Sequence, residues 1–202
     1  MIPKRGKAYI PYGVNDVDCV LNANVLGVLA SMGVPPSPEM RKIADWLLSI
    51  IDYPKCQSCA VYYPTANTLG YAIVKAWRRG SCLLEPAIPT LVDQLIKAQK
   101  SDGSWPDEML GNGVQASLHA VNSLLEIQLK SGRDLTEFIR PGMDFLLSKM
   151  NRIDNKIWLD GGIVFSAGSM FKTKHVWESD AYTTALLLQA IVNFQIVTER
   201  KY

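Results

Sequence analysis

Four residues near the start of the chain have the types and the spacing needed for acid–base chemistry. Asp16 and Asp18 stand two positions apart at the head of the apolar segment 17–32, with Cys19 next to them. An apolar environment keeps a carboxyl group protonated, and a second carboxylate nearby strengthens that effect or shares the proton. Asn22 lies one helical turn after Asp18 and can orient its side chain. These residue types and this spacing would suit a general acid at Asp18, with Asp16, Cys19 and Asn22 as the residues that would tune it.

The same residues have simpler structural roles, and the sequence leaves both interpretations open. Asp16 can stabilise the first turn of a helix, with Asn15 as the cap of that helix. Asp18 can hydrogen-bond a neighbouring loop. Neither role requires chemistry.

Helices must position these residues, because apolar residues recur at helical spacing through most of the chain and no segment alternates as a strand does. The sequence therefore predicts an all-α protein. Four segments are apolar on nearly every side, which predicts inner helices surrounded by protein. They begin near Asp16, Thr65, Asn112 and Ser179. Three segments between them are apolar on one face only, which predicts outer helices beginning near Ser37, Glu85 and Thr136.

A repeat supports this alternation of inner and outer helices. Asp45, Asp93 and Asp144 are each followed two positions later by leucine, and they stand 48 and 51 positions apart. That spacing fits a helical hairpin with its turns. We therefore predict one helical-repeat domain over residues 1–202, with 1–14 as an N-terminal extension and about three and a half hairpins.

One repeat ends in a longer motif, L-x3-Q-x3-G-x-W, formed by Leu95, Gln99, Gly103 and Trp105. A glutamine at a helix end can hydrogen-bond the next turn, a glycine permits a tight reversal, and a tryptophan can pack back onto the helices. The motif resembles the repeat of the triterpene cyclase and protein prenyltransferase superfamily. That resemblance implies an α/α toroid, in which inner and outer helices alternate around a ring.

Within that superfamily, the segment around Asp18 resembles the D-x-D-D motif of class II terpene cyclases such as squalene-hopene cyclase. Asp16 and Asp18 match the motif, while Cys19 is similar to the cysteine that oxidosqualene cyclases carry there. The resemblance implies that Asp18 protonates an alkene or epoxide of an apolar isoprenoid and so starts its cyclisation. Aromatic faces would stabilise the resulting carbocation. The candidates for substrate binding are Trp77, Trp177, Tyr182 and Tyr63.

Metal and cofactor chemistry is not expected. The zinc-binding set of the protein prenyltransferases is missing, because Val17 precedes Asp18 and Cys19, and Thr183 stands where the histidine would fall. Cys56 and Cys59 have the spacing of half a zinc site or of a redox pair. Three residues could complete a zinc site: Cys82, His119 and His175. We predict that His119 is a hydrogen-bonded core residue, and we predict no metal and no cofactor.

The composition of the chain indicates which classes of partner it can bind. With 21 basic and 19 acidic residues scattered along the chain, nothing attracts nucleic acid. The N-terminus resembles no export signal, which predicts a cytoplasmic protein, with peripheral membrane contact as a further option. The apolar stretch 185–197 is shorter than the ~20 residues that span a bilayer.

The length of the chain, 202 residues, is about half of a six-hairpin ring. An open half-ring exposes inner helices to water. We therefore expect a homodimer or a partner subunit to complete the ring, with collapse into a compact bundle as the alternative. The alternative to a cyclase is a non-catalytic half-toroid that binds a lipid or a protein.

Overall fold

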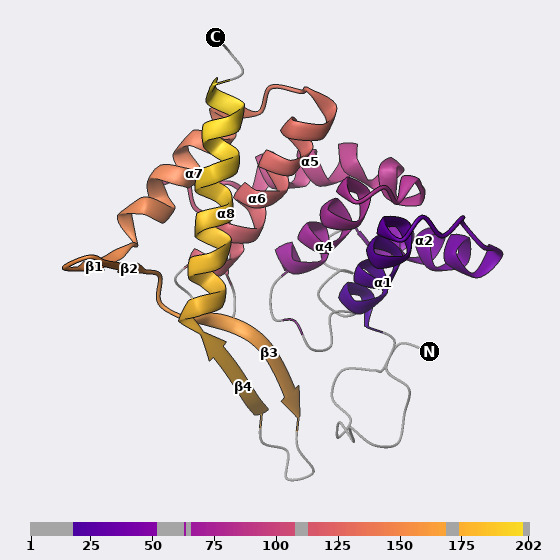
Figure 1. The fold of residues 1–202 in the computed structure, drawn as a ribbon, viewed down its shortest axis with the longest axis horizontal. Coiled ribbons are helices and arrows are strands. Elements are labelled where there is room, and N and C mark those ends of the chain that lie inside the picture. The colour runs from indigo at the N-terminus through magenta and orange to yellow at the C-terminus, as the bar shows by residue number, and fades with distance from the viewer. Residues whose placement is uncertain (1–17, 52–62, 64–65, 108–112, 169–173, 200–202) are drawn as a thin grey trace.

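The computed structural model describes residues 18–51, 63, 66–107, 113–168 and 174–199. Most of these residues are helical, which confirms the predominantly helical class. Four helices form a row in which each contacts the next (Figure 1). They are α1 (Cys19–Ser31), α4 (Ala66–Arg78), α6 (Val114–Ser131) and α8 (Asp180–Glu199). Each begins within a few residues of a predicted inner helix.

The remaining helices pack against this row. They are α2 (Pro38–Ile50), the 3-10 helix η1 (Cys82–Ala87), α5 (Ile88–Ala98) and α7 (Thr136–Ser148). The start of α2 has the residues predicted for it, because Ser37 is its N-cap, Pro38 is its first residue and Glu39 lies in its first turn. The hydroxyl of Ser37 accepts a hydrogen bond from the N–H of Met40 at 3.3 Å. Local sequence therefore fixes where this helix begins.

Two hairpins of short strands correct the expectation of a strand-free chain. β1 (Asn151–Ile153) pairs antiparallel with β2 (Lys156–Trp158), and β3 (Gly162–Gly168) pairs antiparallel with β4 (Lys174–Ser179). The pairing of β3 with β4 is irregular between Ile163 and Phe165. Such short, irregular strands leave no sustained alternation in the sequence, so periodicity does not reveal them.

The Gln99–Trp105 motif holds three helices together, as its residue types predicted. Gln99 donates to the carbonyl oxygens of Gly103 at 3.2 Å and Phe138 at 2.9 Å, which joins the end of α5 to α7. Trp105 is fully buried, and its indole N–H donates to the carbonyl of Leu95 at 2.8 Å. Gly103 has a φ of +84°, and a Cβ there would lie 2.2 Å from the carbonyl oxygen of Pro141. Only glycine fits this turn.

The helices at the two ends of the row differ from their prediction. We expected both to be surrounded by protein, yet α1 and α8 each leave one apolar side open. The reason is their position, since α4 and α6 have row neighbours on both sides whereas α1 and α8 have one each. By length and composition α8 is the one described helix long and apolar enough to cross a membrane, and 28% of its apolar window is buried.

Candidate functional site

Asp18 is the N-cap of α1 rather than a residue within the helix. It is 1% exposed, and its Oδ1 accepts a hydrogen bond from the N–H of Leu21 at 2.9 Å. A carboxylate in this position interacts favourably with the unpaired N–H groups and the dipole of the helix. The geometry therefore gives Asp18 a structural role that it performs without any chemistry.

The residues predicted to tune Asp18 take different places. Asn22 donates from Nδ2 to the backbone carbonyl of Asp18 at 2.8 Å, so its amide holds the cap from the backbone side. Cys19 is fully buried at the first position of α1. Asp16 lies outside the described residues, as do Cys56 and Cys59. The structure thus brings Cys19 and Asn22 to Asp18.

One predicted substrate-binding tyrosine, Tyr63, interacts electrostatically with Asp18, and a second, Tyr182, interacts with Tyr63. Burial raises the pKa of Tyr63, and the negative charge of Asp18 raises it further. Burial also raises the pKa of Tyr182, with a smaller contribution from Tyr63. Tyr63 therefore links Asp18 and Tyr182 electrostatically.

His119, on α6, contacts Tyr182 in turn. Its ring is fully buried, with Nδ1 3.3 Å from the hydroxyl of Thr68 and Nε2 3.2 Å from the hydroxyl of Tyr182. The ring of Tyr71 stacks on it, with 5.2 Å between the centroids. Burial lowers the pKa of His119 to about 3, and the ammonium group of Lys75 adds to the effect. The imidazole is neutral, so one hydroxyl donates to it and the other accepts from it.

The prediction that His119 is a hydrogen-bonded core residue is confirmed. Thr68, Tyr71 and His119 form with Tyr182 a group that we call the aromatic cluster. Thr68 and Tyr71 were not identified from the sequence, although residues three positions apart are neighbours on the surface of a helix. The signal that could have found them is the set of polar and aromatic residues at helical spacing within apolar segments.

A polar group lies farther along α6, around Glu126. Glu126 accepts from Arg78 at 3.0 Å, from Gln189 at 3.2 Å and from Asn193 at 3.3 Å. The hydroxyl of Tyr71 donates to Gln189 at 3.2 Å, which connects this polar group to the aromatic cluster. The aromatic cluster and the polar group around Glu126 therefore belong to one connected network along α4, α6 and α8.

The two predicted tryptophans lie elsewhere. Trp77 is in the hydrophobic core, with the ammonium group of Lys130 4.2 Å from its ring centroid. Trp177 is half exposed on β4, opposite Phe165 on β3. Of the predicted substrate-binding residues, Tyr63 therefore interacts with Asp18 and Tyr182 with Tyr63, whereas Trp77 is a core residue.

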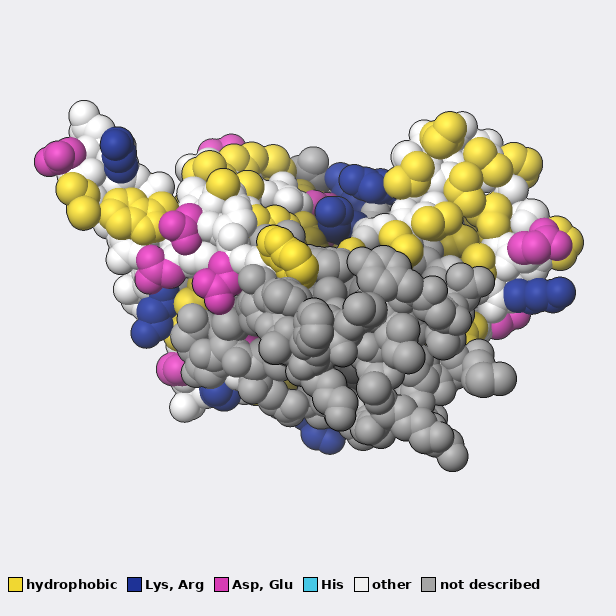
Figure 2. Space-filling model, turned by 90° about the horizontal axis from the view of Figure 1, so that it is seen from below, with side chains coloured by type: hydrophobic (Ala, Val, Ile, Leu, Met, Phe, Trp, Pro, Cys, Tyr) yellow, Lys and Arg dark blue, Asp and Glu magenta, His cyan; other side chains and the backbone are white. Residues whose placement is uncertain are grey.

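The surface over this row is uneven. Figure 2 shows hydrophobic side chains gathered on separate lobes, with lysine and arginine side chains in the hollow between them. Lys75 contributes to the positive charge of α4, and its ammonium group lies 5.1 Å from the ring centroid of Tyr71. Burial lowers the pKa of Lys75, and Arg79 lowers it further.

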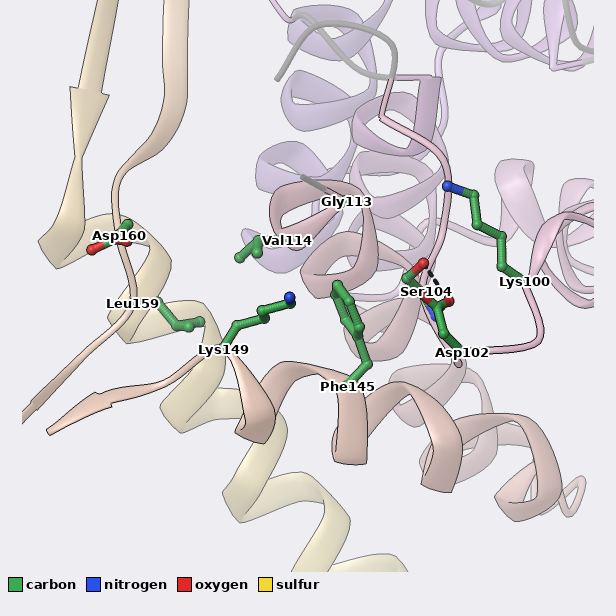
Figure 3. A pocket seen from close by; sticks show the side chains of 9 residues that line it. All are labelled: Lys100, Asp102, Ser104, Gly113, Val114, Phe145, Lys149, Leu159 and Asp160. Atoms are coloured by element: carbon green, nitrogen blue, oxygen red, sulfur yellow. Dashed lines mark hydrogen bonds between the residues drawn. The ribbon is translucent and has the colours of Figure 1, made fainter. Parts of the chain in front are cut away.

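A second hollow lies away from this network, beside the start of α6 (Figure 3). It has a volume of about 390 Å³, and Lys100, Asp102, Lys149 and Asp160 stand around it. The hydroxyl of Ser104 donates to Asp102 at 2.7 Å and, with the Ser104 N–H, lowers the pKa of that carboxyl. None of the residues that line this hollow belongs to the predicted site, and its charged surroundings are unsuited to an apolar ligand.

The described residues contain no group of three or more His, Cys, Asp or Glu side chains that could hold a metal ion. Comparison of the chain with protein-family models, curated proteins and solved structures gives no match. Support for the candidate site therefore comes from its own residues and their contacts.

Proposed function

We propose that the chain is a half-ring of the α/α-toroid type that binds an apolar, isoprenoid-type molecule over α1, α4, α6 and α8. The observation that carries this proposal is the aromatic cluster beside Tyr63 and Asp18. Tyr63 and Tyr182 are only partly buried, and the hydroxyl of Tyr182 lies 3.2 Å from Nε2 of His119, so their rings are the apolar surfaces open to a ligand, while buried Tyr71 and His119 support them from within. Such rings favour an unsaturated hydrocarbon chain and any positive charge that develops on it.

The order of the helices supports the half-ring. Inner helices α1, α4, α6 and α8 contact one another in chain order, and α2, α5 and α7 follow them alternately in the sequence. The Gln99–Trp105 clamp links successive outer helices, as expected for a repeat motif. These features agree with an α/α repeat. We propose in addition that the repeat curves into part of a ring.

Ligand binding is tested with geranylgeraniol as the probe and native mass spectrometry as the readout. Tyr182→Ala removes a half-buried ring from the aromatic cluster, and we expect it to weaken binding at least tenfold. Phe145→Ala is the matched control, because Phe145 is also a half-buried aromatic residue but lines the second hollow. Loss of binding in the control alone would move the site to that hollow and contradict the proposal.

A second candidate function is proton-initiated cyclisation by Asp18, favoured by the burial of this carboxyl beside Tyr63. The proton would pass from Asp18 to a terminal alkene carbon. A second alkene of the same molecule would attack the resulting carbocation, and its π electrons would form the carbon–carbon bond that closes the ring. The ring carbocation would then lose a proton or add water, and solvent would return the proton to Asp18. Aromatic rings near the carbocation would lower the barrier.

Asp18→Asn separates this function from binding alone. Asparagine caps a helix about as well as aspartate, so the fold is retained while the acid is lost. With squalene as the probe and gas chromatography of the products, we expect the wild type to form a cyclic product and Asp18→Asn to form none. Equal product from both proteins would show that Asp18 is not the acid, and no product from the wild type would leave binding without catalysis.

A further inference from the structure

The two ends of the helix row carry matching apolar edges. On α1 the exposed residues recur at intervals of four, three and four: Leu21, Val25, Val28 and Met32. On α8 they recur at intervals of four: Leu188, Val192 and Ile196. We call these sets the α1 edge and the α8 edge. The α1 edge spans about three helical turns and the α8 edge a little over two, each on one side, the pattern of a helix that packs against another helix.

Each edge belongs to a helix that has one row neighbour. Within the row, α4 packs between α1 and α6, and α6 packs between α4 and α8. In contrast, α1 packs on α4 and α8 packs on α6, and the two edges are apolar sides of α1 and α8 that the structure leaves exposed. Figure 1 shows α1 and α8 at opposite ends of the row.

Charge does not oppose pairing of the edges. Neither α1 nor the stretch of α8 from Ala181 to Thr198 contains an Asp, Glu, Lys or Arg residue. Burying these edges therefore desolvates no charged side chain. An uncharged, apolar helix side that faces water is typical of a protein interface.

The area is close to that of a stable interface. The seven edge residues are between 37% and 71% exposed. At about 200 Å² for a fully exposed residue of this size, these fractions amount to roughly 700 Å² per copy, against roughly 800 Å² per partner in a standard interface. Both edges must be buried together to reach this area.

We propose that a second copy of the chain covers both edges, with the α1 edge of each copy packed on the α8 edge of the other. A two-fold axis buries both edges of both copies at once and leaves no open end, so the assembly stops at two. The row of inner helices then continues from one copy into the next. This pairing does not depend on which ligand the row binds.

The mass in solution is the first test. Sedimentation equilibrium should give twice the 22.4 kDa of the single chain. A monomer at tens of micromolar would overturn the proposal. A monomer that also floats with phosphatidylcholine vesicles would overturn it in favour of a lipid surface on the same edges.

Two charge variants then test which edges meet. Val28→Lys on α1 and Val192→Glu on α8 should each give a monomer, because both contacts of the two-fold pair lose their apolar character. A mixture of the two variants should restore a dimer, since one contact is then wild type and the other joins lysine to glutamate. Failure of the mixture to dimerise would contradict pairing between α1 and α8.

Ile153→Lys is the matched control, because Ile153 is an exposed apolar residue on β1, outside both edges. It should remain dimeric. Far-ultraviolet circular dichroism should show the same helix content in all the variants, since each changes an exposed side chain. Dissociation of the Ile153→Lys dimer would show that the charge, rather than its position, breaks the assembly, and would contradict the proposal.

Discussion

At the scale of single residues, Asp18 combines two roles that make opposite demands on its carboxyl group. As the N-cap of α1 it accepts the N–H of Leu21, and the helix dipole favours a negative charge in that place. As the proposed acid it would need to hold a proton. Substitutions at this residue distinguish the two roles because stability and turnover respond to them differently.

The structural role predicts a difference between two variants of Asp18. Asp18→Ala removes the cap and should lower the free energy of unfolding by about 1 kcal/mol, while Asp18→Asn should change it by only a few tenths. Urea unfolding monitored by circular dichroism measures both. An equal loss in the two variants would show that the charge of Asp18, rather than its hydrogen bond to α1, stabilises the fold.

His119 predicts how stability depends on pH. The folded protein lowers its pKa to about 3, whereas the unfolded chain has the ordinary value near 6.5. As the pH falls from about 6.5 toward 3, the unfolded chain binds a proton that the folded protein does not. The free energy of unfolding should therefore fall with pH, by up to about 1.4 kcal/mol per pH unit from this group.

The control for this dependence is His119→Gln, which keeps hydrogen-bonding groups but does not titrate. Urea unfolding of both proteins between about pH 7 and pH 4.5 isolates the contribution of the imidazole. The wild type should lose more stability than the variant over this range. Parallel pH profiles would mean that the buried His119 does not govern acid sensitivity.

At the scale of the elements, the turn between α5 and α6 depends on Gly103. Gly103→Ala places a Cβ on the carbonyl of Pro141 at a positive φ, and should cost about 3 kcal/mol or more. Gly132→Ala has a similar φ, +73°, but meets nothing within 4 Å, so it should cost only about 1 to 2 kcal/mol. Thermal unfolding compares them. Equal costs would show that the close contact with Pro141 does not hold α7 in place.

The elements also show what the sequence could predict and what it could not. The start of α2 and the clamp from Gln99 to Trp105 were predictable, because caps, turns and helical periodicity act over a few residues. The pairing of His119 with Tyr182 spans 63 positions, and it depends on α6 and α8 being neighbours. The open sides of α1 and α8 depend on the same global arrangement. Periodicity records which residues are apolar but not which helix covers them.

At the scale of the whole molecule, the same row of helices carries both the proposed ligand site and the proposed contact between copies. The aromatic cluster joins α4, α6 and α8, and the apolar edges lie on the exposed sides of α1 and α8. A second copy would therefore enlarge the apolar surface beside the cluster without replacing it. Binding and assembly can thus be measured separately, with variants of Tyr182 for one and of Val28 for the other.

The central claim is that the aromatic cluster binds an apolar isoprenoid-type molecule, and binding of geranylgeraniol by the full chain tests it most directly. Native mass spectrometry should show the ligand on the wild type and on Phe145→Ala, and at least tenfold less on Tyr182→Ala. No binding by the wild type, or equal binding by Tyr182→Ala, would contradict the claim.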